Sequence, residues 1–294
     1  MLRRRMLTML GVVTLTVLAL ATAKFISIYQ QIQQFSGPRP PIAVSAATAS
    51  LQAEQAAQLQ QQTEQLKQQI PIQYIFETAF FGPLTLKVTP ATLIPRPETE
   101  ELCHLISQKN KSIESSNGPI IEGLDIGTGS GCIPIYLLHH NPQWKFTAVD
   151  VSEDALDVAA ENAFHVGVHD RIQLTQSNFL AWESLPHNID LLVSNPPYIE
   201  LIEAKDMADN VLKHEPHLAL FTPKNDPLIF YRKMAQLAET AMAQRTKPLH
   251  IWLEINQYLA EETKQLFALF AEAEVIRDLS DNPRFIQAIV LPKG

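Results

Sequence analysis

The fold of this chain is decided at residues 120–131, IIEGLDIGTGSG, where an apolar run leads straight into three glycines. Gly127, Gly129 and Gly131 allow the backbone to turn tightly after a strand and to approach a ligand without clashes from Cβ atoms. A helical pattern begins just after them, so free backbone N–H groups face the ligand. Their G-x-G-x-G spacing differs from the G-x-G-x-x-G of dinucleotide binders, and a purely structural glycine turn remains the alternative.

Apolar strands and helical patterns alternate around this stretch. Strands are expected at 120–126, 145–150, 171–176, 189–194, 249–255, 274–279 and 285–291, and helices near 131–140, 152–166, 227–244 and 257–272. This alternation predicts a mostly parallel sheet covered by helices on both faces. The last two strands, joined by Asp281-Asn282-Pro283, are expected to form an antiparallel hairpin at the sheet edge. We therefore predict an α/β fold with a seven-stranded Rossmann-like sheet.

The strand at 189–194 stops abruptly at Asn195-Pro196-Pro197-Tyr198. Two consecutive prolines cannot continue a strand, because neither donates a backbone N–H and both have a fixed φ. An amide side chain and an aromatic ring are thus held at the carboxyl end of a buried strand, where ligands bind in open α/β sheets.

This loop suits chemistry on a planar nitrogen. An amide or aromatic amine nitrogen is a poor nucleophile, because its lone pair is delocalised. The Asn195 side-chain carbonyl and the Pro196 backbone carbonyl could accept its two N–H groups, while Tyr198 stacks on the substrate. Together with the glycine turn, the loop favours methyl transfer from S-adenosylmethionine. We predict that Asn195, Pro196 and Tyr198 are catalytic, and that Asn195, Pro196, Pro197 and Tyr198 bind the substrate.

Two further strand ends carry candidate cofactor contacts. Asp150 could accept hydrogen bonds from both hydroxyls of a ribose; the alternative is a helix cap, for which Ser152 is the better candidate. Asn178 could bind the amino group of an adenine, and Phe179 could lie against the base or belong to the core. The predicted cofactor-binding set is Gly127, Thr128, Gly129, Ser130, Gly131, Asp150, Asn178, Phe179 and Asn195.

Charge and composition limit the alternatives. The 294 residues carry a net charge of −8, which argues against a nucleic-acid surface. The histidines lack metal-ligand spacing with acids or cysteines, so no metal is expected. Glu254, at the end of the fifth strand, is expected either to face the site or to be a structural acid. Glu161 and Asn162 are expected on a helix surface.

The amino terminus differs from the rest of the chain. Arg3-Arg4-Arg5 precede the uncharged residues 6–23, and no acid occurs before Glu54. A mitochondrial transit peptide, a secretory signal, a membrane anchor in contact with the bilayer through residues 6–23, and an apolar helix of a cytosolic domain all stay open. Residues 1–35 are expected to be this leader, 36–70 a linker (36–50) and a Gln-rich helix (51–69), 71–97 a β-hairpin linker, and 98–294 the catalytic domain.

Five segments carry a resemblance to a known family. They are PIQYI at 71–75, LIPRPETE at 93–100, LDIGTGSG at 124–131, VSNPPYI at 193–199 and HEPHLAL at 214–220. Together they resemble the HemK/PrmC family of release-factor glutamine N5-methyltransferases. LIPRPETE separates this family from DNA adenine methyltransferases that share Asn-Pro-Pro-Tyr.

The resemblance implies the substrate and the partner. The substrate would be the glutamine of a Gly-Gly-Gln loop in a peptide-chain release factor, with no direct nucleic-acid contact and a monomeric enzyme. The leader and Pro283-Arg284-Phe285 are similar to the mitochondrial branch, so a mitochondrial location is expected. Asn178 departs from the family, which has an acid there, and residues 24–70 are short for the family's N-terminal helical domain.

Three other functions stay open. The chain could be an adenine N6-methyltransferase of nucleic acid, a methyltransferase of another protein side chain such as lysine, or a catalytically silent binding or membrane-tethered module. The acidic charge and the lack of a basic stripe disfavour the first. The intact Asn-Pro-Pro-Tyr disfavours the last.

Overall fold

The structure is a computed structural model that describes residues 41–109, 113 and 120–292. The chain divides into two compact units, Met1–Gln61 and Gln62–Gly294. The predicted leader, residues 1–35, lies outside the described residues. No helix within the described ranges is both long enough and apolar enough to cross a membrane.

Helix α2 (Pro41–Lys67) supplies all the described residues of the first unit. The expected linker at 36–50 is therefore wrong over 41–50, where the chain is already helical. A proline is tolerated at the first position of a helix, because its missing N–H needs no partner there. No glycine or further proline follows until after Lys67, so nothing in the sequence stops the helix earlier.

A small β-hairpin follows the short helix α3 (Ile72–Ile75), as expected for residues 71–97. Strands β1 (Thr78–Phe81) and β2 (Leu84–Lys87) pair antiparallel in a sheet of their own. The Asn162 side chain connects this hairpin to the glycine turn. Its Oδ1 accepts from the Lys87 N–H, and its Nδ2 donates to the Lys87 carbonyl and, at 2.9 Å, to the Ser130 carbonyl. Asn162 is buried, so its expected place on the helix surface is wrong.

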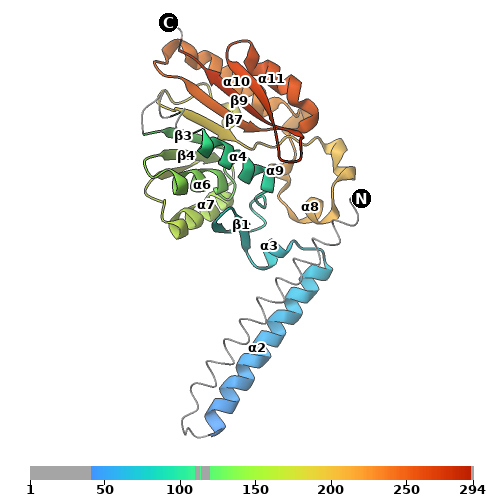
Figure 1. The fold of residues 1–294 in the computed structure, drawn as a ribbon. Helices are drawn as coiled ribbons and strands as arrows, with labels where there is room; N and C mark the ends of the chain where they lie inside the picture. The colour runs from blue at the N-terminus through green and yellow to red at the C-terminus, as the bar shows by residue number, and fades with distance from the viewer. Residues whose placement is uncertain (1–40, 110–112, 114–119, 293–294) are drawn as a thin grey trace. The chain divides into compact units, whose positions relative to one another are not determined.

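The main sheet has seven strands, all of them at predicted positions (Figure 1). They are β3 (Glu122–Ile126), β4 (Lys145–Asp150), β5 (Ile172–Gln176), β6 (Leu191–Ser194), β7 (Leu249–Glu254), β8 (Glu272–Arg277) and β9 (Pro283–Val290). Their spatial order is β5-β4-β3-β6-β7-β9-β8, and only the pairs of β9 are antiparallel. The predicted mostly parallel sheet with a final hairpin at its edge is confirmed.

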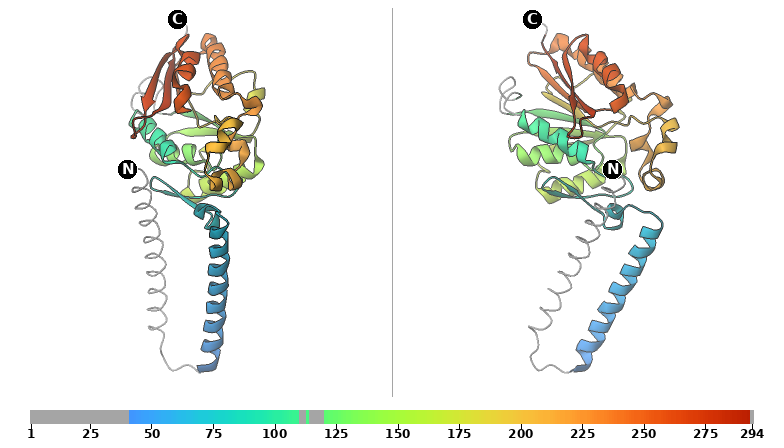
Figure 2. Two further views of the ribbon diagram at one scale, coloured as in Figure 1. Left: turned by 90° about the vertical axis from the view of Figure 1, so that its right-hand side faces the viewer. Right: turned by 45° about the vertical axis from the view of Figure 1, so that its right-hand side comes forward.

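Helices cover both faces of this sheet (Figures 1 and 2). The first face carries α4 (Pro97–Gln108), α6 (Cys132–His140) and α7 (Glu153–Val166), and the second carries α10 (Ile229–Ala241) and α11 (Ala260–Ala268). Strand β6 shows the two layers, since Leu191 packs in the first cluster and Leu192 in the second. A strand that is buried on both faces has a continuous apolar run, which is what made these strands recognisable.

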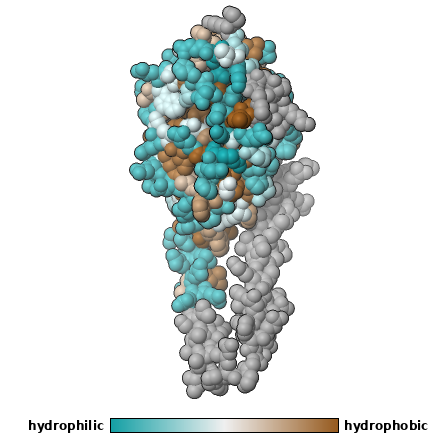
Figure 3. Space-filling model, turned by 90° about the vertical axis from the view of Figure 1, so that its left-hand side faces the viewer, coloured by the Kyte–Doolittle hydropathy of each residue, from teal (hydrophilic) through white to brown (hydrophobic). Residues whose placement is uncertain are grey.

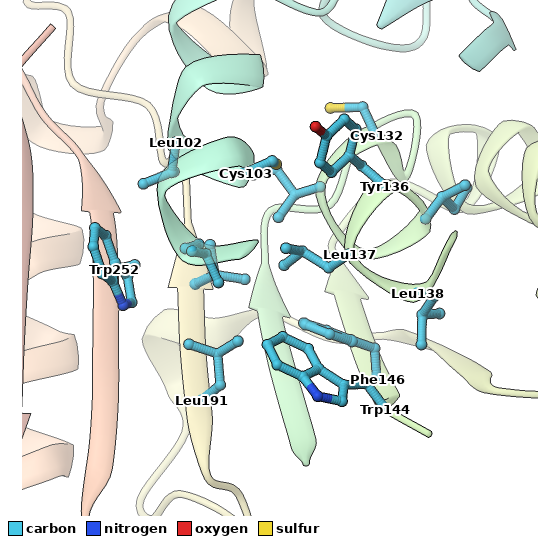
Figure 4. Close-up of a cluster of buried hydrophobic side chains, with 14 of the residues drawn as sticks. Leu102, Cys103, Cys132, Tyr136, Leu137, Leu138, Trp144, Phe146, Leu191 and Trp252 are labelled. Atoms are coloured by element: carbon cyan, nitrogen blue, oxygen red, sulfur yellow. The ribbon is translucent and has the colours of Figure 1, made fainter. Parts of the chain in front are cut away.

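The first cluster is drawn in Figure 4. Leu102 and Cys103 of α4 and Leu137 of α6 face the sheet beside Leu191 and Trp252. This packing holds α4 against the middle of the sheet. On the face of the second unit that Figure 3 shows, hydrophilic residues cover most of the surface, and hydrophobic ones appear between them.

The segment between β6 and α10 consists of short helical turns that the sequence pattern did not predict. They are η2 (Leu201–Asp206), α8 (Asp209–His214), α9 (His217–Leu220) and η3 (Pro223–Asn225). Pieces this short show no helical periodicity. Similar single turns are η1 (Phe179–Ala181), η4 (Met242–Gln244) and η5 (Gln257–Leu259). A parallel bridge between Ile199 and Phe221, outside the main sheet, joins two parts of this segment.

Candidate active site

A cavity of about 520 Å³ opens at the carboxyl ends of β3, β4, β5 and β6. Its wall includes most of the residues predicted from the sequence, namely Gly127, Thr128, Gly129, Ser130, Asp150, Asn178, Phe179, Asn195, Pro196 and Pro197. A smaller cavity of about 110 Å³ shares Asn195, Pro196 and Pro197 and adds Tyr198 and Glu254. The structure thus gathers residues from four strand ends, and the Asn195 loop lies where the two cavities meet.

The three glycines of the turn have different surroundings. All three have positive φ, at +74° for Gly127, +53° for Gly129 and +77° for Gly131. A Cβ added at Gly127 or Gly129 would meet nothing within 4 Å, whereas one at Gly131 would lie 2.8 Å from the Ile135 Cδ1 atom. The first two glycines therefore leave open space for a ligand. Gly131, which is outside the cavity wall, permits close packing of α6.

Asp150, the last residue of the neighbouring strand β4, is hydrogen-bonded to the backbone of the glycine turn. Its Oδ2 accepts a hydrogen bond from the Gly129 N–H at 2.9 Å, and its Oδ1 accepts one from the Ser152 N–H at 3.0 Å. Ser152 caps α7 by accepting from the Ala155 N–H at 3.2 Å, which confirms the predicted cap. Each carboxylate oxygen of Asp150 keeps a second lone pair that a ribose hydroxyl could use.

Asp125 is a buried acid next to the glycine turn that sequence reasoning did not single out. It lies inside β3 with no exposed surface, and no residue in the described part of the chain makes a hydrogen bond of ordinary geometry to either carboxylate oxygen. Burial raises its pKa to about 7, against the opposing influence of the nearby Thr128 hydroxyl. The hydroxyls of Thr128 and Ser130 are likewise buried without a partner among the described residues. The signal that could have revealed Asp125 is an acid within an apolar strand.

Asn178 and Phe179 follow β5 and form one corner of the cavity. The Asn178 Oδ1 accepts from the Leu180 N–H at 3.1 Å and caps η1, and the residue is otherwise exposed. Phe179 is buried against Trp182 with ring centroids 5.5 Å apart, and it also lines the cavity. Both roles considered for Phe179, core residue and cavity wall, are therefore compatible.

Asn195 and Tyr198 are joined through one buried carboxylate. The Asn195 Nδ2 donates to the Thr99 Oγ1 at 3.0 Å, and the Thr99 hydroxyl donates to the Glu254 Oε2 at 2.6 Å. The Tyr198 hydroxyl donates to the other oxygen, Oε1, at 3.4 Å. Glu254 is 2% exposed, and burial raises its pKa to about 7. Of the two roles expected for Glu254, the structure supports an acid that contacts the site residues.

A second acid joins two of the family-like segments. The Arg96 Nη2 donates to both carboxylate oxygens of Glu215, at 2.7 and 2.8 Å, and Glu215 Oε2 also accepts from the Ile94 N–H at 3.3 Å. LIPRPETE and HEPHLAL are therefore in direct contact although they lie far apart in the sequence. Arg96 lines both cavities, so this pair fixes one wall of the cleft.

Comparisons with known proteins identify relatives of this chain. A family model described as methyltransferase small domain matches residues 113–220. The release factor glutamine methyltransferase of Flavobacterium psychrophilum is 44% identical over 228 residues, which cover 76% of this chain and 76% of that protein. The protein of the same name from Streptococcus pneumoniae is 38% identical over 231 residues, covering 79% and 78%.

A solved structure shares the fold. The catalytic domain of human METTL16, in complex with the MAT2A 3′UTR hairpin 6, superimposes with a TM-score of 0.54 over 73% of this chain and 77% of that one. Its identity of 17% supports a common fold and nothing more. The identity to the bacterial enzymes, over three quarters of their length, goes further, and by it the chain belongs to the release factor glutamine methyltransferase family.

Proposed function

We propose that this protein methylates the side-chain amide nitrogen of the glutamine in the Gly-Gly-Gln motif of a peptide-chain release factor, with S-adenosylmethionine as methyl donor. The observation that carries the proposal is the Asn195 amide, fixed by Thr99 at the junction of the two cavities. Family membership supplies the substrate class, because the relatives of known name are release factor glutamine methyltransferases.

The larger cavity suits S-adenosylmethionine. Its volume lies within the roughly 300–1,000 Å³ common for small-molecule sites. Open space stands over Gly127 and Gly129, and the buried hydroxyls of Thr128 and Ser130 have no partner among the described residues. The turn from Gly127 to Ser130 would hold the amino-acid part, Asp150 the ribose, and Asn178 with Phe179 the adenine. When bound, this cofactor supplies a methyl group on a positively charged sulfur.

The Asn195 loop would orient the substrate amide. A glutamine side-chain nitrogen is a poor nucleophile, since its lone pair is delocalised in the amide. Transfer would form its bond to the methyl carbon, break the bond of that carbon to the cofactor's sulfur and release one of the two N–H protons. The carbonyls of Asn195 and Pro196 would accept its two N–H groups, and the Tyr198 ring would pack on its plane. Alignment of this kind can supply about 7–11 kcal/mol of a reaction barrier.

The test is methyl transfer by the full chain from radiolabelled S-adenosylmethionine to a purified release factor. A factor whose Gly-Gly-Gln glutamine is changed to alanine serves as the matched control. Label on the unchanged factor alone would support the proposal. Label on both factors would place the methyl group elsewhere, and label on nucleic acid with neither protein modified would establish the adenine alternative.

We further propose that the protein acts as a monomer. We also propose that residues 1–35 are a mitochondrial transit peptide that is cleaved off. An arginine cluster followed by an uncharged run supports this. The relatives reported above are bacterial and do not bear on the location. Fractionation of cells expressing the full chain, with sequencing of the mature N-terminus, distinguishes the outcomes. An intact N-terminus in the membrane fraction would instead support an anchor through residues 6–23.

A further inference from the structure

We propose that Thr99 and Glu254 are positioning residues that determine which atom of the Asn195 amide group, oxygen or nitrogen, faces the substrate. This inference rests on the proposed function, because it concerns how Asn195 receives the glutamine amide. Neither residue needs to touch a reacting atom. They act through hydrogen bonds that fix the rotation of the Asn195 side chain.

The three side chains come from three separate elements. Thr99 lies in the first turn of α4, Glu254 is the last residue of β7, and Asn195 follows β6. Thr99 Oγ1 is 2.6 Å from Glu254 Oε2 and 3.0 Å from Asn195 Nδ2. Thr99 is 3% exposed, so bulk water does not compete for these bonds.

The direction of these hydrogen bonds follows from the number of protons. An ionised carboxylate can only accept, so the single proton of the Thr99 hydroxyl must point to Glu254. Thr99 then offers only lone pairs to Asn195, and only the NH₂ end of that amide can bond to it. The Asn195 oxygen is thereby turned away from Thr99 and is left for an N–H group of the substrate.

Protonation of Glu254 would remove this constraint. A neutral carboxyl group can donate to Thr99, which can then turn its own proton toward Asn195 and bond to the oxygen of that amide. The amide would rotate and present its NH₂ end to the NH₂ of the substrate, where two donors meet and no hydrogen bond forms. The same residues thus have a productive and an unproductive arrangement, and the charge on Glu254 selects between them.

The surroundings of Glu254 place this change near neutral pH. Burial is the largest influence and raises its pKa to about 7; Glu98 adds to the rise, while Thr99, Tyr198 and Arg284 oppose it. The other titratable groups that sense its charge are Tyr231, Cys103 and Cys132. Because the ionised form holds the productive arrangement, the rate should fall as the pH drops through about 7.

The experiment compares Thr99→Val, which keeps the shape and removes the hydroxyl, with Thr99→Ser, which keeps the hydroxyl. The full chain is assayed for kcat and KM with a release factor between about pH 6 and about pH 9. Thr99→Val should lose about 100-fold in kcat, the loss typical of a misplaced reacting group. Thr99→Ser should recover most of that loss. Calorimetry of S-adenosylmethionine binding and thermal unfolding should show both variants folded, with similar affinity.

Glu254→Gln gives an independent measurement. Because Gln does not titrate, the rate of this variant should lack the decline that the unchanged protein shows near pH 7. A Thr99→Val enzyme with the original kcat, or a Thr99→Ser enzyme as slow as Thr99→Val, would overturn the inference. If Thr99→Val does not fold, the inference would be overturned by a Glu254→Gln enzyme whose rate still declines near pH 7 as that of the unchanged protein does. Failure of the proposed function looks different, because the unchanged protein would bind cofactor yet methylate no glutamine at any pH.

Discussion

The glycine turn after β3 and the Asn195 loop after β6 end neighbouring strands, yet their polar groups are arranged in contrasting ways. Around the turn, the oxygens of Asp125, Thr128 and Ser130 are buried without a hydrogen-bond partner among the described residues. Around the loop, Asn195 and Tyr198 are bonded through Thr99 and Glu254. An unpaired buried polar group costs about 1–3 kcal/mol, and Thr128 and Ser130 line the larger cavity, where a ligand can bond to their hydroxyls. The loop is already organised for a substrate.

This difference assigns separate tasks to the two regions. Changes in the loop should alter the rate with little effect on cofactor affinity. Changes around the turn should alter stability or cofactor affinity.

The largest effect is expected from Asn195→Ala. Removal of the side-chain carbonyl that would hold the substrate amide should lower kcat about 1,000-fold, as loss of one well-placed polar contact can do. The protein should stay folded and bind S-adenosylmethionine within about tenfold of its original affinity, equivalent to about 1.4 kcal/mol. Methyl transfer and calorimetry on the same preparation check both. Equal losses in rate and cofactor affinity would remove the distinction between the loop and the turn.

Asp125 should make the stability of the ligand-free protein depend on pH. Its pKa is raised from 3.8 to about 7 in the folded state, so the folded protein holds a proton that the unfolded chain has already released. The contribution of Asp125 to the free energy of unfolding should therefore be greatest below about pH 4 and decline until about pH 7. The total decline is on the order of 4 kcal/mol.

Urea unfolding across this range measures the decline, and Asp125→Asn is the control. In the variant, the free energy of unfolding should decline less with pH, because Asp125 no longer titrates. Some decline should remain, because the pKa of Glu254 is also raised to about 7. Identical pH profiles for the variant and the unchanged protein would mean that Asp125 is not a strained acid.

Two glycine substitutions sharpen the description of the turn. Both Gly127→Ala and Gly131→Ala place a side chain at positive φ, which costs about 1–2 kcal/mol. Only at Gly131 does the new Cβ atom also crowd Ile135, so this variant should be the less stable in thermal unfolding. At Gly127 the Cβ atom points into open space of the cavity, so this variant should lose more cofactor affinity. The opposite ranking in either measurement would contradict the roles given to these two glycines.

The smallest effect is expected from Tyr198→Phe. The ring stays, and the variant loses a 3.4 Å hydrogen bond to Glu254, a contact of about 1 kcal/mol. The kcat should fall about fivefold with the cofactor affinity unchanged. A loss as large as that of Asn195→Ala would mean that the hydroxyl itself contacts the substrate.

Local sequence pattern was enough to predict the sheet and the positions at four strand ends that line part of the larger cavity. Buried strands read as apolar runs, and Gly127 and Asn195 stood out because each directly follows such a run. The start of α2 at Pro41 was missed, because a proline-rich stretch read as a linker although a proline can begin a helix.

What stayed out of reach depends on contacts between distant segments. Thr99 sits in a helix that starts nearly a hundred residues before Asn195, and no periodicity indicates that they meet. The same holds for Arg96 with Glu215 and for Asn162 with Lys87. Glu254 was recognised as an acid at a strand end, but its role depended on the identity of its neighbours.

The place of β9 has a consequence for the order in which the enzyme becomes active during its synthesis. Strand β7, which ends in Glu254, is completed on one side by β9, with Glu254 opposite Phe285 and the Ile255 N–H bonded to the Arg284 carbonyl at 2.9 Å. A nascent chain that has left the ribosome only as far as β7 already has its glycine turn and its Asn195 loop. It still lacks β9, the strand that pairs with the backbone of β7 beside Glu254. We expect such a ribosome-bound chain to begin methyl transfer only after β9 has emerged and paired with β7, because domains generally fold as units.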